Sequence, residues 1–149
     1  MITAIATTLL TLAVTAADLN FPGDLRGKDL AAVQKHFPGE WQVHAELKTD
    51  CPASSYNGQD VKVGTETVKA FAVFYQGKLL YLLLKGNHNV SVAVAEKYGL
   101  LETDTPYTKE DDDFIITVRI GAETYADFVD KKLFRESRNC RQQNLQELL

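Results

Sequence analysis

Two apolar stretches in the middle of the chain give the strongest pattern in the sequence. Val68 to Tyr75 and Leu79 to Lys85 are rich in Val, Phe, Tyr and Leu, and Gln76-Gly77 joins them. Two β-type stretches around a short glycine turn are typical of a β-hairpin. The second stretch is apolar on both faces, which predicts a central strand that is covered on both sides.

Strict alternation of apolar and polar residues predicts two further strands. The first is half-buried and covers Trp41 to Lys48, and the second covers Phe114 to Ile120. The inward-facing residues are Trp41, Val43, Ala45 and Leu47 in the first strand, and Phe114, Ile116, Val118 and Ile120 in the second. Val61 to Val68 indicates a weaker strand.

Helical spacing of apolar residues predicts a short helix over Lys28 to Phe37, which Pro38-Gly39 ends. The clearest helix is expected from Ala122 to about Asn139. Its apolar stripe consists of Tyr125, Phe128, Val129 and Leu133. Val90 to Leu101 fits a strand and a helix equally well, and we expect a strand at its start and a helix or turn at its end.

The segments between these elements have turn-like or polar sequences. Thr49 to Asp60 contains Asn57-Gly58, a strong turn pair, and Glu102 to Asp113 is a polar loop that ends in an acidic run. The whole pattern predicts a single α+β domain. Its antiparallel sheet has four to six strands, with N-terminal and C-terminal helices packed on it.

The first residues have the pattern of an export signal. Ile2 to Val14 contains no charged side chain, and the small residues of Val14-Thr15-Ala16 close the run. Such a run is what signal peptidase accepts, so we predict a signal peptide at residues 1–16, a domain at 17–149, and a secreted or periplasmic location. The alternative is a buried strand or helix of the domain itself. The run is too short to span a bilayer, which needs about 20 apolar residues.

Cys51 and Cys140 are the two cysteines of the chain. Disulfides persist in oxidising compartments, so export predicts that these two residues are bonded to each other. The alternatives are two buried free thiols or a reactive Cys51 beside Pro52. Neither a Cys-x-x-Cys motif nor a zinc-ligand spacing is present.

Composition and missing motifs argue against several classes of function. The chain is 45% hydrophobic and 24% charged, as in globular proteins, and its formal net charge of −4 argues against a nucleic-acid partner. It lacks the signature motifs of nucleotide-binding enzymes, zinc peptidases and α/β-hydrolases, and we expect no cofactor.

The residues that could bind a metal lack ligand spacing. His36, His44 and His88 are scattered, so we expect no metal site from them. Glu110 to Asp113 is the densest acidic run, and we interpret it as a solvated loop, with a calcium site as the alternative.

Cationic residues of the C-terminal helix fall on one stripe, at i, i+4 and i+7: Lys131, Arg135 and Arg138. Phe134 lies beside them, and an aromatic among arginines is typical of an interface hot spot. We therefore predict that this stripe binds a protein partner, with an acidic surface as its complement. The alternative is a solvated helix face with Asp127 and Lys131 as an ordinary i, i+4 pair. Asn89-Val90-Ser91 is a glycosylation acceptor if the exporting cell is eukaryotic.

Phe37-Pro38-Gly39-Glu40-Trp41 resembles the Gly-x-Trp motif that opens a lipocalin, and a strand followed by a helix near the C-terminus is also similar. This resemblance implies a cavity for a small apolar ligand. The favoured function is nevertheless a secreted or periplasmic, non-enzymatic binding protein, such as an inhibitor, immunity-type or effector protein. A small apolar-ligand carrier and a hydrolase with a dispersed site are the alternatives.

Overall fold

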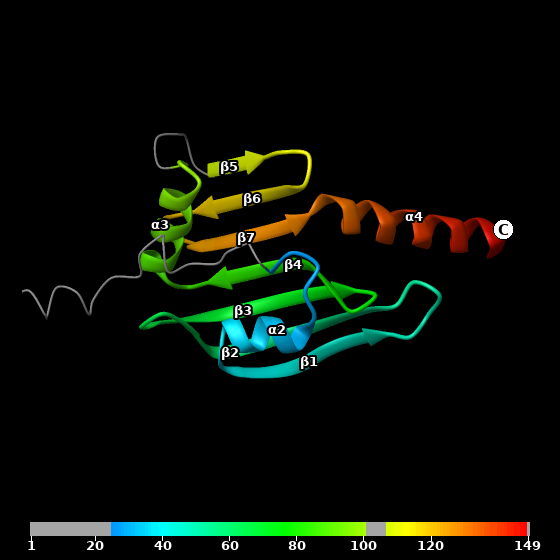
Figure 1. Cartoon of the computed structure of the whole chain (residues 1–149), viewed down its shortest axis with the longest axis horizontal. Helices are drawn as coiled ribbons and strands as arrows, with labels where there is room; N and C mark the ends of the chain where they lie inside the picture. The colour runs from blue at the N-terminus through cyan, green and yellow to red at the C-terminus, as the bar shows by residue number, and fades with distance from the viewer. Residues whose placement is uncertain (1–24, 101–106, 149) are drawn as a thin grey trace, which may run out of the picture.

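The computed structural model describes residues 25–100 and 107–148, and the export signal expected at residues 1–16 lies outside these. The fold is α+β, as predicted, but its single antiparallel sheet has seven strands rather than four to six. Figure 1 shows the strands side by side in the order β1-β2-β3-β4-β7-β6-β5. The elements are α2 (Leu30–His36), β1 (Glu40–Leu47), β2 (Ala53–Val63), β3 (Glu66–Tyr75), β4 (Lys78–Lys85), α3 (His88–Lys97), β5 (Tyr107–Glu110), β6 (Phe114–Arg119), β7 (Tyr125–Asp130) and α4 (Lys131–Leu148).

The sheet is open, because β1 and β5 form its two edges and do not pair with each other. A lipocalin is a closed barrel, so the resemblance of Phe37 to Trp41 to the Gly-x-Trp motif does not extend to the fold. No helix among the described residues is long and apolar enough to cross a bilayer.

The β-hairpin predicted around Gln76-Gly77 is confirmed. Gln76 and Gly77 have φ angles of 52° and 75°, as a two-residue turn of type I′ requires, and this turn joins β3 to β4. Strand β4 is the fourth of the seven strands, as expected for a central strand. Only one of its faces is fully covered, since Tyr81 and Leu83 remain half-buried on the other.

Helices α2 and α3 pack on one face of the sheet, which we call the covered face. The fully buried side chains beneath them include Phe74, Leu82, Leu84, Ile116, Val118 and Phe128. Helix α2 lies within the predicted range and contributes Val33, while Phe37 directly after it is also buried. Asp29 caps this helix by accepting a hydrogen bond from the Ala32 N–H at 2.9 Å.

Helix α3 corrects the expectation of a strand at Val90. The Asn87 side chain accepts a hydrogen bond from the Val90 N–H at 3.1 Å, and this cap starts a helix that continues to Lys97. Val90, Ala93 and Val94 then face the core at the i, i+3, i+4 spacing of a helix. The cap and this spacing together override the β-propensity of the valines.

Strand β2 corrects the loop predicted from Thr49 to Asp60. Gly58 of the Asn57-Gly58 pair lies within this strand, not in a turn. A Cβ at this position would approach Val61 Cγ2 to 2.6 Å and the Trp41 ring to 3.2 Å. Glycine is therefore required by close packing rather than by a turn. The strand bulges between Gly58 and Val61, where Asp60 has a φ of 49°.

The helix predicted from Ala122 begins later than expected. Residues 125–130 form β7, in which Ala126, Phe128 and Asp130 are buried and the alternate residues are half-buried. Asp130 then caps α4, because its Oδ1 accepts the Leu133 N–H at 3.0 Å. The stripe expected on one helix is thus split between a strand and a helix.

Candidate functional site

Neither α2 nor α3 covers the second face of the sheet, which we call the open face, and among the described elements only α4 contacts it, at one end. Alternate side chains of the central strands point to it and are only half-buried: Phe71, Val73, Tyr81, Leu83 and Val129. Apolar residues that are half-exposed on a flat sheet suit contact with another molecule.

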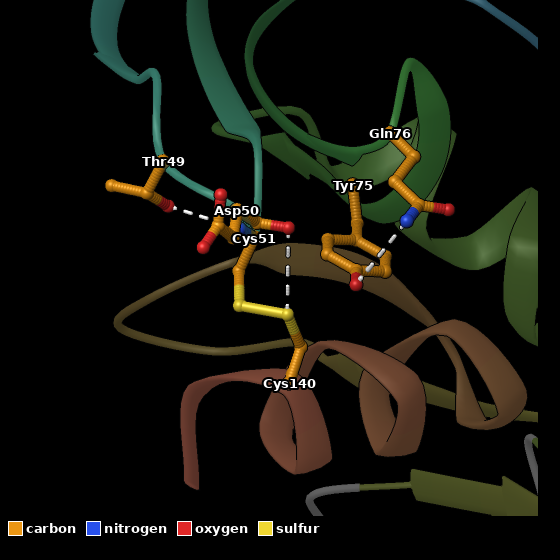
Figure 2. The surroundings of a disulfide bond; sticks show 6 residues. All are labelled: Thr49, Asp50, Cys51, Tyr75, Gln76 and Cys140. Atoms are coloured by element: carbon orange, nitrogen blue, oxygen red, sulfur yellow. Dashed lines mark hydrogen bonds between the residues drawn. A yellow bond between two sulfur atoms is a disulfide. The ribbon is translucent and has the colours of Figure 1, made fainter. Parts of the chain in front are cut away.

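Helix α4 continues from β7 beyond the end of the sheet, on the side where the β1–β2 loop lies (Figure 1). The predicted disulfide between Cys51 and Cys140 is present and joins this loop to α4 across 89 positions of sequence. Figure 2 shows Tyr75 beside the disulfide. A small buried cluster forms around the bond, and it consists of Cys51, Tyr75, Leu80 and Leu133.

An apolar groove of about 270 Å³ lies between α4 and the end of the open face. Phe71, Val73 and Leu80 line it from the sheet, Leu47 lines it from β1, and Phe134 and Arg141 line it from α4. The disulfide joins α4 to the loop between β1 and β2, and residues on both sides of this loop line the opposite wall, so the two walls are linked covalently. The groove offers a contact surface that is already formed before any ligand binds.

Two walls of the groove expose large apolar side chains. Leu47 is 54% exposed and Phe134 is 43% exposed, and Val43 is the other large exposed hydrophobic residue among those described. Burial of such side chains on binding is favourable, since each removes apolar area from water. Two of these three exposed apolar side chains therefore face each other across the groove, while Val43 lies outside it.

Leu47 reaches the groove because β1 contains a bulge between Val43 and Ala45. Trp41 packs against the core of the covered face, whereas Ala45 and Leu47 line the groove. The prediction that these residues share one inward face is wrong, because the extra residue of a bulge reverses the alternation. The strand is also more exposed than expected, with only Trp41 half-buried, since β1 lies at an edge of the sheet.

The cationic stripe predicted on the C-terminal helix is divided in the structure. Lys131 forms a salt bridge with Glu110 at 3.1 Å and donates a hydrogen bond to the Asp111 carbonyl at 2.8 Å, so it anchors α4 to the β5–β6 loop. Arg135 and Arg138 are exposed and form no ion pair within the described residues. The suggested helical pair of Asp127 and Lys131 is wrong, because Asp127 belongs to β7.

Leu47 and Arg141 belong to the groove, and sequence reasoning did not place them in a site. Arg141 follows Phe134 by seven positions, which is two helical turns, so the spacing alone could have grouped them. Leu47 gave no such signal, because its position depends on the bulge in β1. Phe134 is the sequence-predicted residue that the structure places directly in the groove.

Asp127 is a half-buried carboxylate on the open face. The Tyr81 hydroxyl donates a hydrogen bond to Asp127 Oδ2 at 3.3 Å. Burial raises the pKa of Asp127, although this hydrogen bond and one from the Thr117 backbone oppose the shift. Burial and the nearby Asp127 charge also raise the pKa of Tyr81. The pair keeps a polar group satisfied on a mainly apolar surface.

His44 and Asp111 of the acidic run each make contacts within the fold. His44 Nδ1 lies 3.3 Å from Asn57 Nδ2, and its ring packs edge-on against Phe71. Asp111 accepts backbone hydrogen bonds from Asp113 and Phe114, which lower the pKa of Asp111 and organise the turn before β6. Among the described residues no group of three His, Cys, Asp or Glu side chains could hold a metal ion.

Comparison of the chain with protein-family models, with curated proteins and with solved structures finds no match. Its function is therefore inferred from the groove and the charges around it.

Proposed function

We propose that the protein is an exported, non-enzymatic binding protein whose groove receives an apolar side chain or short apolar segment of a protein partner. The single observation that carries this proposal is the exposure of Leu47 and Phe134 on the two walls of a groove whose walls a disulfide joins. The disulfide also supports an oxidising compartment, as the pattern of residues 1–16 does.

The geometry suits a hot spot. Aromatic anchors in desolvated pockets contribute most of the binding free energy of protein interfaces, and Phe134 is positioned to do so. A groove that is already formed reduces the ordering cost of association. Arg138 follows Phe134 by four positions and Arg141 by seven, so positive charge borders the same helix face. These charges favour a partner that is acidic around its apolar anchor.

The alternatives fit the groove less well. Pockets for drug-sized ligands occupy roughly 300–1,000 Å³, and this groove of about 270 Å³ lies below that range. Its apolar lining would still admit a small amphipathic carboxylate beside Arg141. For a hydrolase, the groove supplies the hydroxyls of Ser54, Ser55 and Ser137, but no histidine or carboxylate is among its described lining residues.

Selection from a random peptide library displayed on phage tests the proposal. We expect the folded, disulfide-bonded protein to select peptides with an aromatic or aliphatic anchor between acidic residues. Phe134→Ala should weaken a selected peptide at least about tenfold, which corresponds to about 1.4 kcal/mol. Lys35→Ala is the matched control, since Lys35 is an exposed residue of α2 on the other side of the sheet, and it should leave the affinity unchanged.

Two results would contradict the proposal. Selected peptides that bind Phe134→Ala as tightly as the unchanged protein would place the interface elsewhere. Retention of a small apolar molecule in native mass spectrometry, together with failure to select any peptide, would instead identify the groove as a small-ligand site.

A further inference from the structure

A row of positive charge crosses the open face at the end opposite the groove. In the strand register Lys69 pairs with Lys85, Lys85 pairs with Tyr125, and Tyr125 pairs with Arg119. Residues that pair directly across an antiparallel sheet point to the same face, so these four side chains form one line over β3, β4, β7 and β6. We call them the basic row.

The basic row is not explained by the stability of the fold. Like charges directly opposite each other destabilise a sheet, and Lys69 and Lys85 occupy such a pair. Lys69, Lys85 and Arg119 are exposed and form no ion pair with the described carboxylates, although the chain as a whole carries a net charge of −4. Three unneutralised cations in line on an acidic protein point to an anion outside the chain.

The surface around the two lysines is hollowed. A depression of about 370 Å³ is lined by Lys69 and Lys85 together with Thr67 and the Gly86 backbone. Asp60 also lines the depression, and Asp127 lies on the same face two positions from Tyr125, so one carboxylate is near each half of the row. The depression can hold one anionic group between the lysines while the rest of the ligand follows the row.

The spacing of the row indicates the shape of its ligand. Neighbouring strands are about 4.8 Å apart, so Lys85 and Arg119 are separated by about 10 Å with the half-buried Tyr125 between them. An aromatic ring with an apolar face and a polar edge can pack against a sugar ring and hydrogen-bond to its hydroxyls. Cations on either side can bind carboxylates or sulfates of the flanking sugars.

We propose that the basic row binds a linear acidic polysaccharide, laid across the strands with one sugar on Tyr125 and its anionic groups at Lys69, Lys85 and Arg119. This site is separate from the groove and does not depend on the function proposed for it. The polysaccharide is favoured over an acidic peptide because Tyr125 separates the cations with a ring that a peptide carboxylate does not use. Nucleic acid is disfavoured by the acidic net charge.

Binding of a defined oligogalacturonate to the disulfide-bonded protein tests this site, with isothermal titration at low salt. We expect binding that weakens as salt rises, with a logarithmic slope of magnitude about 2, because up to three cations contact a single anionic strand. Lys69→Ala and Lys85→Ala should each weaken binding several-fold. Lys35→Ala, an equal loss of charge on α2, should not.

Substitutions of Tyr125 distinguish an acidic polysaccharide from an acidic peptide as the ligand. Tyr125→Leu should weaken oligogalacturonate binding, while Tyr125→Phe should retain most of it. Poly-glutamate with the same number of carboxylates should bind more weakly than the oligogalacturonate and should not respond to Tyr125→Leu. Far-ultraviolet circular dichroism of each variant checks that the sheet is intact.

Three outcomes would overturn the proposal. The first is no binding of the oligogalacturonate at low salt, and the second is an equal loss of affinity in Lys35→Ala and Lys85→Ala. The third is tighter binding of poly-glutamate or of an oligonucleotide than of the oligogalacturonate. The last outcome would assign the basic row to another class of polyanion.

Discussion

The two faces of the sheet differ in how their apolar residues are stabilised. On the covered face, Phe74, Ile116 and Phe128 have exposures of 1% or less beneath α2 and α3. On the open face, Phe71 and Leu83 remain half-buried, and α4 is held at its end by a small cluster and one disulfide. The covered face is therefore stabilised by buried apolar side chains, whereas the open face leaves apolar and charged side chains exposed and relies on one covalent bond at its end.

Removal of the disulfide should have the largest effect. In Cys51→Ala/Cys140→Ala the free energy of unfolding should fall by about 4 to 5 kcal/mol, because the bond closes a loop of 89 positions in the unfolded chain. Urea denaturation measures this loss. A decrease of less than about 1 kcal/mol would show that packing alone holds α4 against the β1–β2 loop.

A matched pair of phenylalanines compares the two faces directly. Phe128→Ala should lower the free energy of unfolding by about 3 to 5 kcal/mol, since it leaves a cavity in the core. Phe134→Ala should lower it by less than about 1 kcal/mol, because this side chain is 43% exposed. Equal losses in thermal or urea unfolding would mean that Phe134 is a core residue and that the hot-spot interpretation is wrong.

Ser91 tests the cost of an unsatisfied polar group in the core of the covered face. Its hydroxyl is buried in α3 without a hydrogen-bond partner among the described residues. Ser91→Ala should raise the free energy of unfolding by about 1 kcal/mol, because it removes an unsatisfied polar group and favours the helix. A destabilised Ser91→Ala variant would reveal an essential hydrogen bond at this position.

The Asp127→Asn variant tests the open face. We expect it to change stability less than the variants above, by an amount that depends on pH. The folded-state pKa of Asp127 is raised, so the fold disfavours the charged form and loses stability as pH rises above the unfolded pKa. Asp127→Asn should therefore raise the melting temperature at pH 7 and leave it nearly unchanged at pH 3. A lower melting temperature at pH 7 would mean that the charged carboxylate stabilises Tyr81 and its surroundings.

The sequence predicts the elements whose pattern is local. The β3–β4 hairpin follows from its own turn residues, and β6 follows from its alternation. The disulfide follows from the number of cysteines and the export pattern. Strand β5, of four residues, is too short to give a pattern within a polar segment. The sequence predicts a helix where β7 forms, because an apolar stripe at helical spacing runs through this strand into α4.

The groove could be predicted only in part. The sequence indicates Phe134 because it is an aromatic residue among arginines, but it carries no signal for the residues of the opposite wall. Leu47 faces the groove only because of a bulge in β1, and Val73 reaches it through long-range strand pairing. The basic row cannot be predicted from the sequence either. Its residues Lys69, Lys85 and Arg119 are far apart in the chain, and only the register of the sheet aligns them.

Chemical-shift mapping by NMR, with a peptide selected from the displayed library, tests the central claim most directly. The account predicts that the largest shifts occur at Leu47, Val73, Phe134 and Arg141, with little change in α2 or α3. Largest shifts in α2 or α3, with the groove unchanged, would contradict the assignment of binding to the open face.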